Sequence, residues 1–165
     1  MDLQTHWPAI LRVLHASKRS NRYFSIATVT PSGQPHVTPI GHVFFREDMT
    51  GYYFDAYSRA MPTNLASNPR ICLMAVTTST SLWLPALIKA RFSAPPGVRL
   101  FGEVSPQRAA TQAEIDELAR SIKSTRMFRG HKLLWGDLRR VRDLRFDGFA
   151  PVAYPVMCEG LWGTE

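Results

Sequence analysis

The stretch Tyr52–Arg70, with the sequence YYFDAYSRAMPTNLASNPR, decides the fold that we expect. Its first residues, Tyr52–Phe54, are apolar and typical of a strand, and a polar elbow follows at residues 55–59. Pro62 then marks the first turn of a short helix, where the N–H that proline lacks has no partner within the helix. A strand that turns directly into a helix leaves free N–H groups and the positive end of the helix dipole beside the elbow.

That elbow has the chemistry of a phosphate site. The hydroxyls of Ser58 and Thr63 and the guanidinium of Arg59 can converge on an anion at the start of the helix. Arginine can bind a phosphate through two parallel hydrogen bonds. Taken alone, the same residues also fit an ordinary capped helix after a strand, so the flanking sequence has to decide.

The preceding sequence predicts a β-hairpin. Tyr23–Val29 is rich in aromatic and β-branched residues, and Pro31–Gln34 has the composition of a turn. The run Pro35–Phe45 then reads as one strand that pairs with the first. Alternation places Val37 on one face of this strand and His36 and Thr38 on the other.

The sequence after the elbow predicts further strands. Arg70–Val76 is almost continuously apolar, which indicates a strand buried on both faces. The segment 77–97 is an apolar insertion that we interpret as a possible dimer-contact flap, since exposed apolar surface usually meets a partner. A cofactor lid or a loop folded on its own core remain alternatives.

The C-terminal half adds helices and a sheet edge. Val98–Ser105 alternates as a strand, and Thr111 with Glu114 forms a T-x-x-E capping box for a helix to about residue 124. The basic run 139–146 fits a charged edge strand and lacks the interleaved aromatics of a nucleic-acid site. Residues 151–162 are expected to close the sheet. At the other end, residues 1–18 show helical periodicity.

The order of these motifs resembles the pyridoxamine 5′-phosphate oxidase-like family, whose members are dimeric FMN-binding split barrels. The runs that carry the resemblance are SIATVTPSGQPHVTPI and FDAYSRA followed by NLASNPR. It implies a mainly β (α+β) fold: a split β-barrel of antiparallel strands with flanking helices. It also implies that the Ser-Arg segment holds the FMN phosphate.

The resemblance has limits at particular residues. Family members usually have Lys after Ser-Arg, where this chain has Ala60. Members that oxidise pyridoxamine phosphate begin the second strand with Arg and end it with Lys, where this chain has His36 and Gly41-His42. The resemblance therefore favours an FMN-dependent oxidoreductase for another small substrate over that particular activity.

The resemblance places eight residues at the cofactor. Four would secure the phosphate and the others would lie beside the ring and ribityl chain: Ser58, Arg59, Thr63 and Asn64, and His36, Val37, Thr38 and Asp55. The family also includes F420-binding and haem-binding proteins, and His36, His42 or His131 are candidate haem ligands. A flavin-binding module without catalysis is a further alternative. The sequence identifies no catalytic acid or base and no protein-bound metal.

Size and composition set the broad class. With 165 residues, 45% of them hydrophobic, the chain fits a single domain over 1–165. Lys and Arg exceed Asp and Glu by 20 − 13 = 7, which favours anionic ligands. No leader or membrane-spanning pattern is evident, so we expect a cytoplasmic protein. We also expect a homodimer with the cofactor at the subunit interface.

Overall fold

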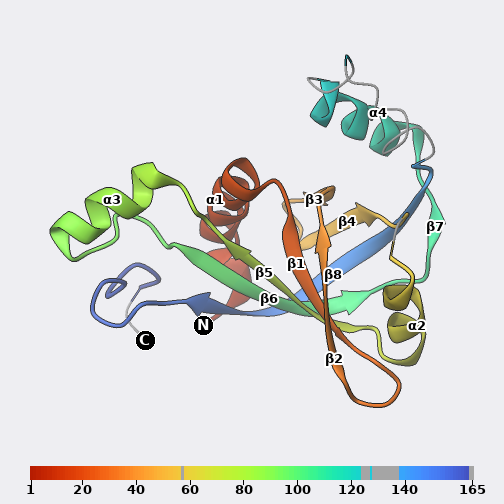
Figure 1. The fold of residues 1–165 in the computed structure, drawn as a ribbon, viewed down its shortest axis with the longest axis horizontal. Helices are drawn as coiled ribbons and strands as arrows, with labels where there is room; N and C mark the ends of the chain where they lie inside the picture. Colours follow the sequence, from red (N-terminus) through yellow and green to blue (C-terminus); the bar gives the residue numbers. More distant parts are fainter. Residues whose placement is uncertain (57, 124–126, 128–137, 164–165) are drawn as a thin grey trace.

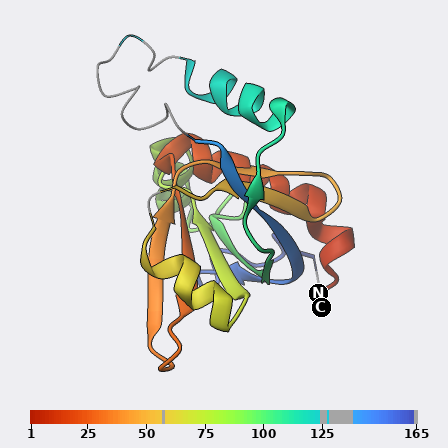
Figure 2. The ribbon, with the colours of Figure 1, turned by 90° about the vertical axis from the view of Figure 1, so that its right-hand side faces the viewer.

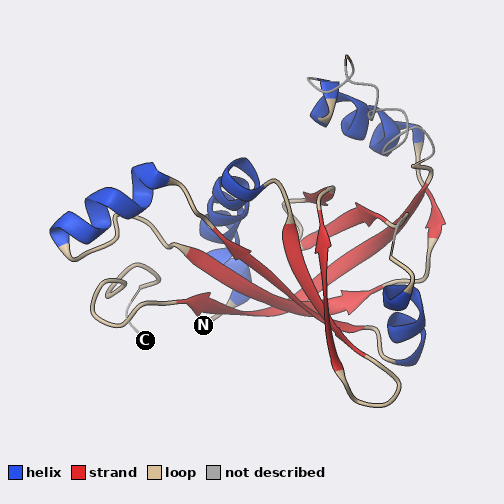
Figure 3. Cartoon of the chain, in the orientation of Figure 1, coloured by secondary structure: helices blue, strands red, loops and turns tan. Residues whose placement is uncertain are grey.

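The computed structural model describes residues 1–56, 58–123, 127 and 138–163. In this part of the chain, eight antiparallel strands form one curled sheet with four helices around it (Figures 1 and 3). The strands are β1 (Phe24–Val29), β2 (Pro35–Ile40), β3 (Val43–Phe45), β4 (Thr50–Phe54), β5 (Arg70–Val76), β6 (Gly97–Val104), β7 (Arg108–Ala109) and β8 (Arg140–Val152). The helices are α1 (Leu3–Asn21), α2 (Ala60–Ser67), α3 (Thr80–Lys89) and α4 (Gln112–Ser121). The predicted split barrel with flanking helices is confirmed.

The strand order explains the curl. Along the sheet the order is β2-β1-β5-β6-β8-β4-β3, with β7 paired to β8 outside this path. The two end strands, β2 and β3, are consecutive in the chain and are joined by Gly41 and His42 alone. Since consecutive Cα atoms are 3.8 Å apart, Ile40 and Val43 lie within about 11 Å of each other. The sheet must therefore bend round until its two edges almost meet.

Helix α1 covers the main hydrophobic core. It begins after Asp2, whose carboxylate accepts a hydrogen bond from the Thr5 N–H at 2.6 Å. Trp7, Ile10 and Leu14 are almost completely buried against the sheet. This is the helix expected near the N-terminus, extended by three residues to Asn21.

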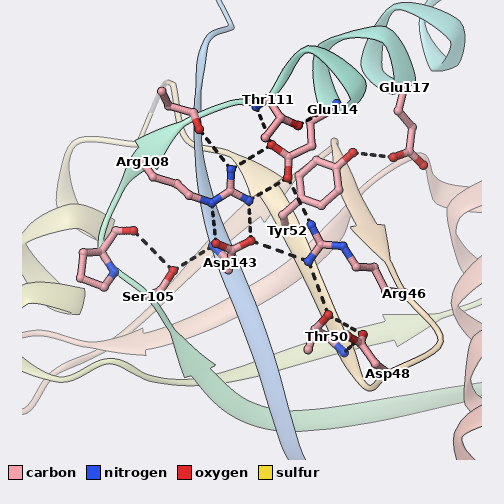
Figure 4. Close-up of polar contacts among 12 residues, drawn as sticks. Arg46, Asp48, Thr50, Tyr52, Ser105, Arg108, Thr111, Glu114, Glu117 and Asp143 are labelled. Atoms are coloured by element: carbon pink, nitrogen blue, oxygen red, sulfur yellow. Dashed lines mark hydrogen bonds and ion pairs between the residues drawn. The ribbon is translucent and has the colours of Figure 1, made fainter.

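A second, smaller core lies under α4, which stands at one end of the molecule and is joined to the sheet through β7 (Figure 2). The capping box predicted for this helix is present, with both hydrogen bonds between Thr111 and Glu114. Arg108 binds Glu114 and Asp143 through pairs of hydrogen bonds of 2.6–2.9 Å (Figure 4). These contacts hold the pKa of Glu114 at about 2, chiefly through the Arg108 hydrogen bonds. Charge pairing thus connects α4 to β7 and β8.

Three strand predictions were wrong. Pro35–Phe45 is two strands, because the chain turns at Gly41-His42 from one edge of the sheet to the other. Arg70–Val76 fully buries one face only, and the other face is partly exposed, with Met74 43% exposed. The basic run predicted at 139–146 falls in β8 from Arg140 onward, a central strand between β6 and β4. Its charges are tolerated there because Arg142 and Asp143 are paired, each through a 2.6 Å contact, and Arg145 is exposed.

The C-terminal run and the insertion also differ from expectation. Strand β8 ends at Val152, so the sheet is completed before residues 153–162, which form turns. Within the insertion 77–97, the structure has a regular helix, α3. Its side chains Leu84, Leu87 and Ile88 are 55%, 64% and 76% exposed and form what we call the α3 patch. None of the helices in the described ranges is long and apolar enough to cross a membrane.

Candidate functional site

A cavity of about 400 Å³ opens where β2, the end of β4 and the segment before α2 meet. We call it the β2–β4 cavity. It brings together three of the eight predicted site residues, Thr38, Asp55 and Ser58. The other described residues that line it are Pro39, Ile40, Gly41, His42, Phe54, Ala56 and Leu138. Cavities of about 680 and 940 Å³ lie elsewhere, and none of the eight predicted residues lines either of them.

Side chains alternate between the two faces of β2, and one of these faces forms a wall of the cavity. Thr38 faces the cavity, and its hydroxyl lies 3.4 Å from Nδ1 of His36, which shares its face of the strand. Val37 points to the opposite face and is 61% exposed. The sequence pattern therefore predicted the two faces correctly, and the cavity lies on the face of Thr38.

Asp55 forms the most buried polar part of the opposite wall. Its side chain is only 3% exposed, and its Oδ2 accepts hydrogen bonds from Arg142 Nε at 2.6 Å and Gln107 Nε2 at 3.2 Å. Its N–H donates to the Arg140 carbonyl at 3.0 Å, which fixes the backbone. A carboxylate held in this way has a defined orientation, with Arg142 compensating its charge. Neither Arg142 nor Gln107 was among the predicted site residues.

The start of α2 lies next to this wall. Ser58 Oγ accepts a hydrogen bond from the Met61 N–H at 3.1 Å, which caps the helix from outside. Arg59 at the N-cap position makes no side-chain cap bond, and the first turn contains no acidic residue. Arg59 is exposed and has no hydrogen-bond or ion-pair partner among the described residues. Among the described residues, no acidic side chain therefore neutralises the positive end of this helix.

The two remaining predicted residues lie farther along α2. Thr63 is exposed on the helix surface. Asn64 is 2% exposed and donates from its side-chain amide to Thr28 Oγ1 at 2.9 Å, which ties α2 to β1. Neither residue lines the β2–β4 cavity. Tyr57 of the elbow and the candidate haem ligand His131 lie outside the described residues.

His42 is a cavity residue that the sequence suggested only as a haem ligand. Burial, with a smaller contribution from the nearby Lys18 ammonium, lowers the pKa of His42 to about 4. The imidazole is therefore neutral at pH 7, and the cavity wall carries no positive charge from it. No cluster of three or more His, Cys, Asp or Glu suited to a metal ion occurs in the described ranges.

Together, these features define a class of protein. A curled antiparallel sheet whose edges are joined at Gly41-His42, with a cavity beside the start of a short helix, is a split barrel. A family model described as pyridoxamine 5′-phosphate oxidase matches residues 11–145. The chain therefore belongs to the pyridoxamine 5′-phosphate oxidase-like split-barrel family, as the sequence motifs predicted.

Solved structures show the same fold. An FMN-binding protein from Syntrophomonas wolfei superposes with a TM-score of 0.61 at 12% identity, covering 91% of this chain and 90% of that one. HupZ of Group A Streptococcus gives 0.56 at 15% identity, covering 86% and 92%. HutZ, the haem storage protein of Vibrio cholerae, gives 0.53 at 15% identity, covering 86% and 95%. A comparison with curated proteins found no match.

Proposed function

We propose that this protein binds FMN in the β2–β4 cavity and acts as an FMN-dependent oxidoreductase on a small substrate. The supporting observation is that Thr38 of β2 meets Asp55 and Ser58 of the elbow at one cavity, next to Arg59, which has no partner among the described residues. The FMN-binding protein from Syntrophomonas wolfei has the same fold and adds support.

The residues present fit the cofactor. The first turn of α2 and Arg59 would hold the phosphate, because both offer positive charge that the chain leaves uncompensated. Thr38 and Asp55 offer hydrogen-bonding groups for the ribityl hydroxyls, since a carboxylate oxygen has more than one acceptor site. Ile40, Phe54 and Leu138 supply apolar surface for a ring and exclude water from one side.

When bound, the isoalloxazine ring supplies redox chemistry that side chains cannot provide. The chain then needs to hold the phosphate, orient the ring and leave one side open to substrate. Neutral His42 adds no charge to the cavity wall. We assign no catalytic acid or base.

FMN and riboflavin, which lacks the phosphate, provide the test. Arg59→Gln should weaken FMN binding about ten-fold. This is the lower end of the loss expected for one charge-assisted hydrogen bond, and we choose it because Arg59 is exposed. Riboflavin affinity should stay the same. Arg91→Gln is a matched control, since Arg91 is also exposed and lies outside the cavity. Unchanged FMN affinity in Arg59→Gln, or an equal loss for riboflavin, would remove Arg59 from the phosphate site.

Haem is the second candidate cofactor. His42 lies on the cavity wall in the neutral form that binds iron, and HutZ of the same fold is a haem storage protein. A Soret band that His42→Ala removes would support haem, whereas flavin bands in the purified protein would support FMN. F420 is the third candidate cofactor, and binding of reduced F420 to the purified protein would support it.

We also propose a homodimer with the cofactor at the subunit interface. The α3 patch supports this, because three adjacent apolar side chains that are more than half exposed are unusual on a monomer's surface. We propose further that residues 1–165 form a single domain in each subunit.

A further inference from the structure

A second cavity lies between α1 and the segment that leads from β5 into α3. We call it the α1–α3 cavity; its volume is about 680 Å³. It shares no lining residue with the β2–β4 cavity, so its chemistry is independent of the proposed flavin site. In Figure 1, α3 extends from the end of β5 on the same side of the sheet as α1.

Two arginines give this cavity a positive rim. Arg12 and Arg19 are seven residues apart on α1, so they lie on the same face with about 10 Å between them along the helix axis. Both are exposed, and neither makes a hydrogen bond or ion pair among the described residues. The described lining residues include no Asp or Glu that could neutralise them. An anion entering the cavity therefore meets two unpaired cations.

The opposite wall is rich in hydroxyl groups whose positions are fixed by contacts within the chain. Ser20 Oγ and Thr77 Oγ1 are 3.2 Å apart, joining α1 to the end of β5. Thr78 Oγ1 donates to Asn21 Oδ1 at 2.5 Å, and Ser79 lies next in the chain. Thr77 is almost completely buried, so this part of the wall is well ordered. The hydroxyls of Ser20 and Thr78 therefore donate within the chain. Thr80 also lines this wall, is exposed, and its hydroxyl makes no hydrogen bond among the described residues, so it can donate to an oxyanion without adding charge.

The rest of the cavity is apolar. Its apolar lining comes from α1, the start of α3 and two loops: Ala9, Val13, Ala16, Leu82, Pro95 and Leu161. Apolar lining with a few convergent polar groups is the usual composition of a small-molecule site. A free inorganic anion would leave this apolar surface uncovered, and a neutral apolar ligand would leave the two arginines unpaired.

We infer that the α1–α3 cavity binds a second ligand, an organic anion with an apolar body, such as an aromatic or aliphatic carboxylate, sulfonate or phosphate. The arginines bind the anionic group at the rim, the hydroxyl wall contacts its oxygens, and the apolar body covers the lining from Val13 to Leu161. The ligand size follows from the cavity volume, which is well within the range of small-molecule sites.

A charged and an uncharged probe with the same aromatic body test this inference. We would titrate the purified protein, saturated with FMN, with 8-anilinonaphthalene-1-sulfonate and separately with N-phenyl-1-naphthylamine, using calorimetry. The double variant Arg12→Gln/Arg19→Gln should weaken binding of the sulfonate about ten-fold, or about three-fold for each exposed cation. Binding of the neutral probe should not change. Both arginines are exposed, so the variant should fold normally.

Two further variants locate the probe. Ala16→Phe, which narrows the cavity, should weaken both probes, whereas the control Arg91→Gln should affect neither. The inference would be overturned if the double variant bound the sulfonate as tightly as the original protein, or if Ala16→Phe left both affinities unchanged. It would also be overturned if excess FMN displaced the sulfonate. A further outcome would also overturn it. If neither probe bound the original protein and the double variant sedimented differently from it, a second copy of the chain would be covering the cavity in place of a ligand.

Discussion

The contact between Asp55 and Arg142 offers a direct test of how this site is built. Asp55 directly follows β4 and lines the β2–β4 cavity, while Arg142 lies on the neighbouring strand β8. Their 2.6 Å contact is buried, with side chains 3% and 12% exposed. We expect Arg142→Met to destabilise the protein, because it leaves the Asp55 carboxylate buried without its cation.

The size of the effect follows from that burial. Removing one partner of a buried ion pair costs about 3–5 kcal/mol. Gln107 still donates to the same Asp55 oxygen at 3.2 Å and offsets part of the loss, so we expect about 3 kcal/mol, at the low end of that range. For a chain of this size, that corresponds to a fall in Tm of roughly 6–12 °C.

Urea denaturation measures this coupling in four variants: Arg142→Met, Asp55→Asn, the two combined, and the control Arg140→Met. The double variant Asp55→Asn/Arg142→Met contains no buried charge, so it should recover most of the stability lost in Arg142→Met. Arg140→Met is the matched control: Arg140 lies on the same strand and is exposed, and among the described residues its side chain hydrogen-bonds Gln107 alone, so its loss should cost less than about 1 kcal/mol. A loss below 1 kcal/mol in Arg142→Met, or strictly additive effects in the double variant, would refute the reasoning.

Three other predictions test separate parts of the molecule. The Arg108 contacts depress the folded-state pKa of Glu114 from 4.5 to about 2, so their stabilisation should be present above pH 4.5 and lost as pH falls towards 2. The Tm difference between the original protein and Glu114→Gln should shrink over that window; a constant difference would count against it. Replacing the α3 patch with serine should shift the protein from dimer to monomer in sedimentation, and an unchanged assembly would argue against this interface. Gly102→Ala should unfold the protein or lower its Tm sharply, because a Cβ there would lie 2.2 Å from the Arg145 carbonyl oxygen, whereas Gly148→Ala should be tolerated.

Features set by neighbouring residues were predictable from the sequence. The capping box of Thr111 and Glu114 depends on a spacing of three residues, and the structure contains both of its hydrogen bonds. The turn before β2 places Gly33 at a φ of +87°, a conformation that glycine adopts easily. In each case the residues that determine the structure lie within one turn of each other, so no knowledge of the tertiary fold is needed.

Features set by strand order were not predictable in this way. The charges of β8 suggested an edge strand, because the sequence alone does not show that Arg142 meets Asp55, 87 residues away. Likewise, the apolar run of β5 suggested burial on both faces, but among the described residues one face is left partly open and Met74 is exposed. The hydrophobic periodicity of a segment indicates which of its faces favours burial. The elements that cover that face depend on the topology of the whole sheet.

The same distinction between local sequence and strand order applies to the residues of the candidate site. Thr38, Asp55 and Ser58 were proposed from two short motifs, PHVTPI and FDAYSRA, and the structure places all three at one cavity, while their role in binding a cofactor stays a prediction. His42 and Leu138 complete the cavity, and Arg142 orients Asp55 within it. Gly41 and His42 join the first and last strands of the sheet, so the same two residues bring the sheet edges together and line the cavity. The cavity is therefore a consequence of how the sheet closes, and changes at the two-residue link should alter ligand binding and sheet curvature together.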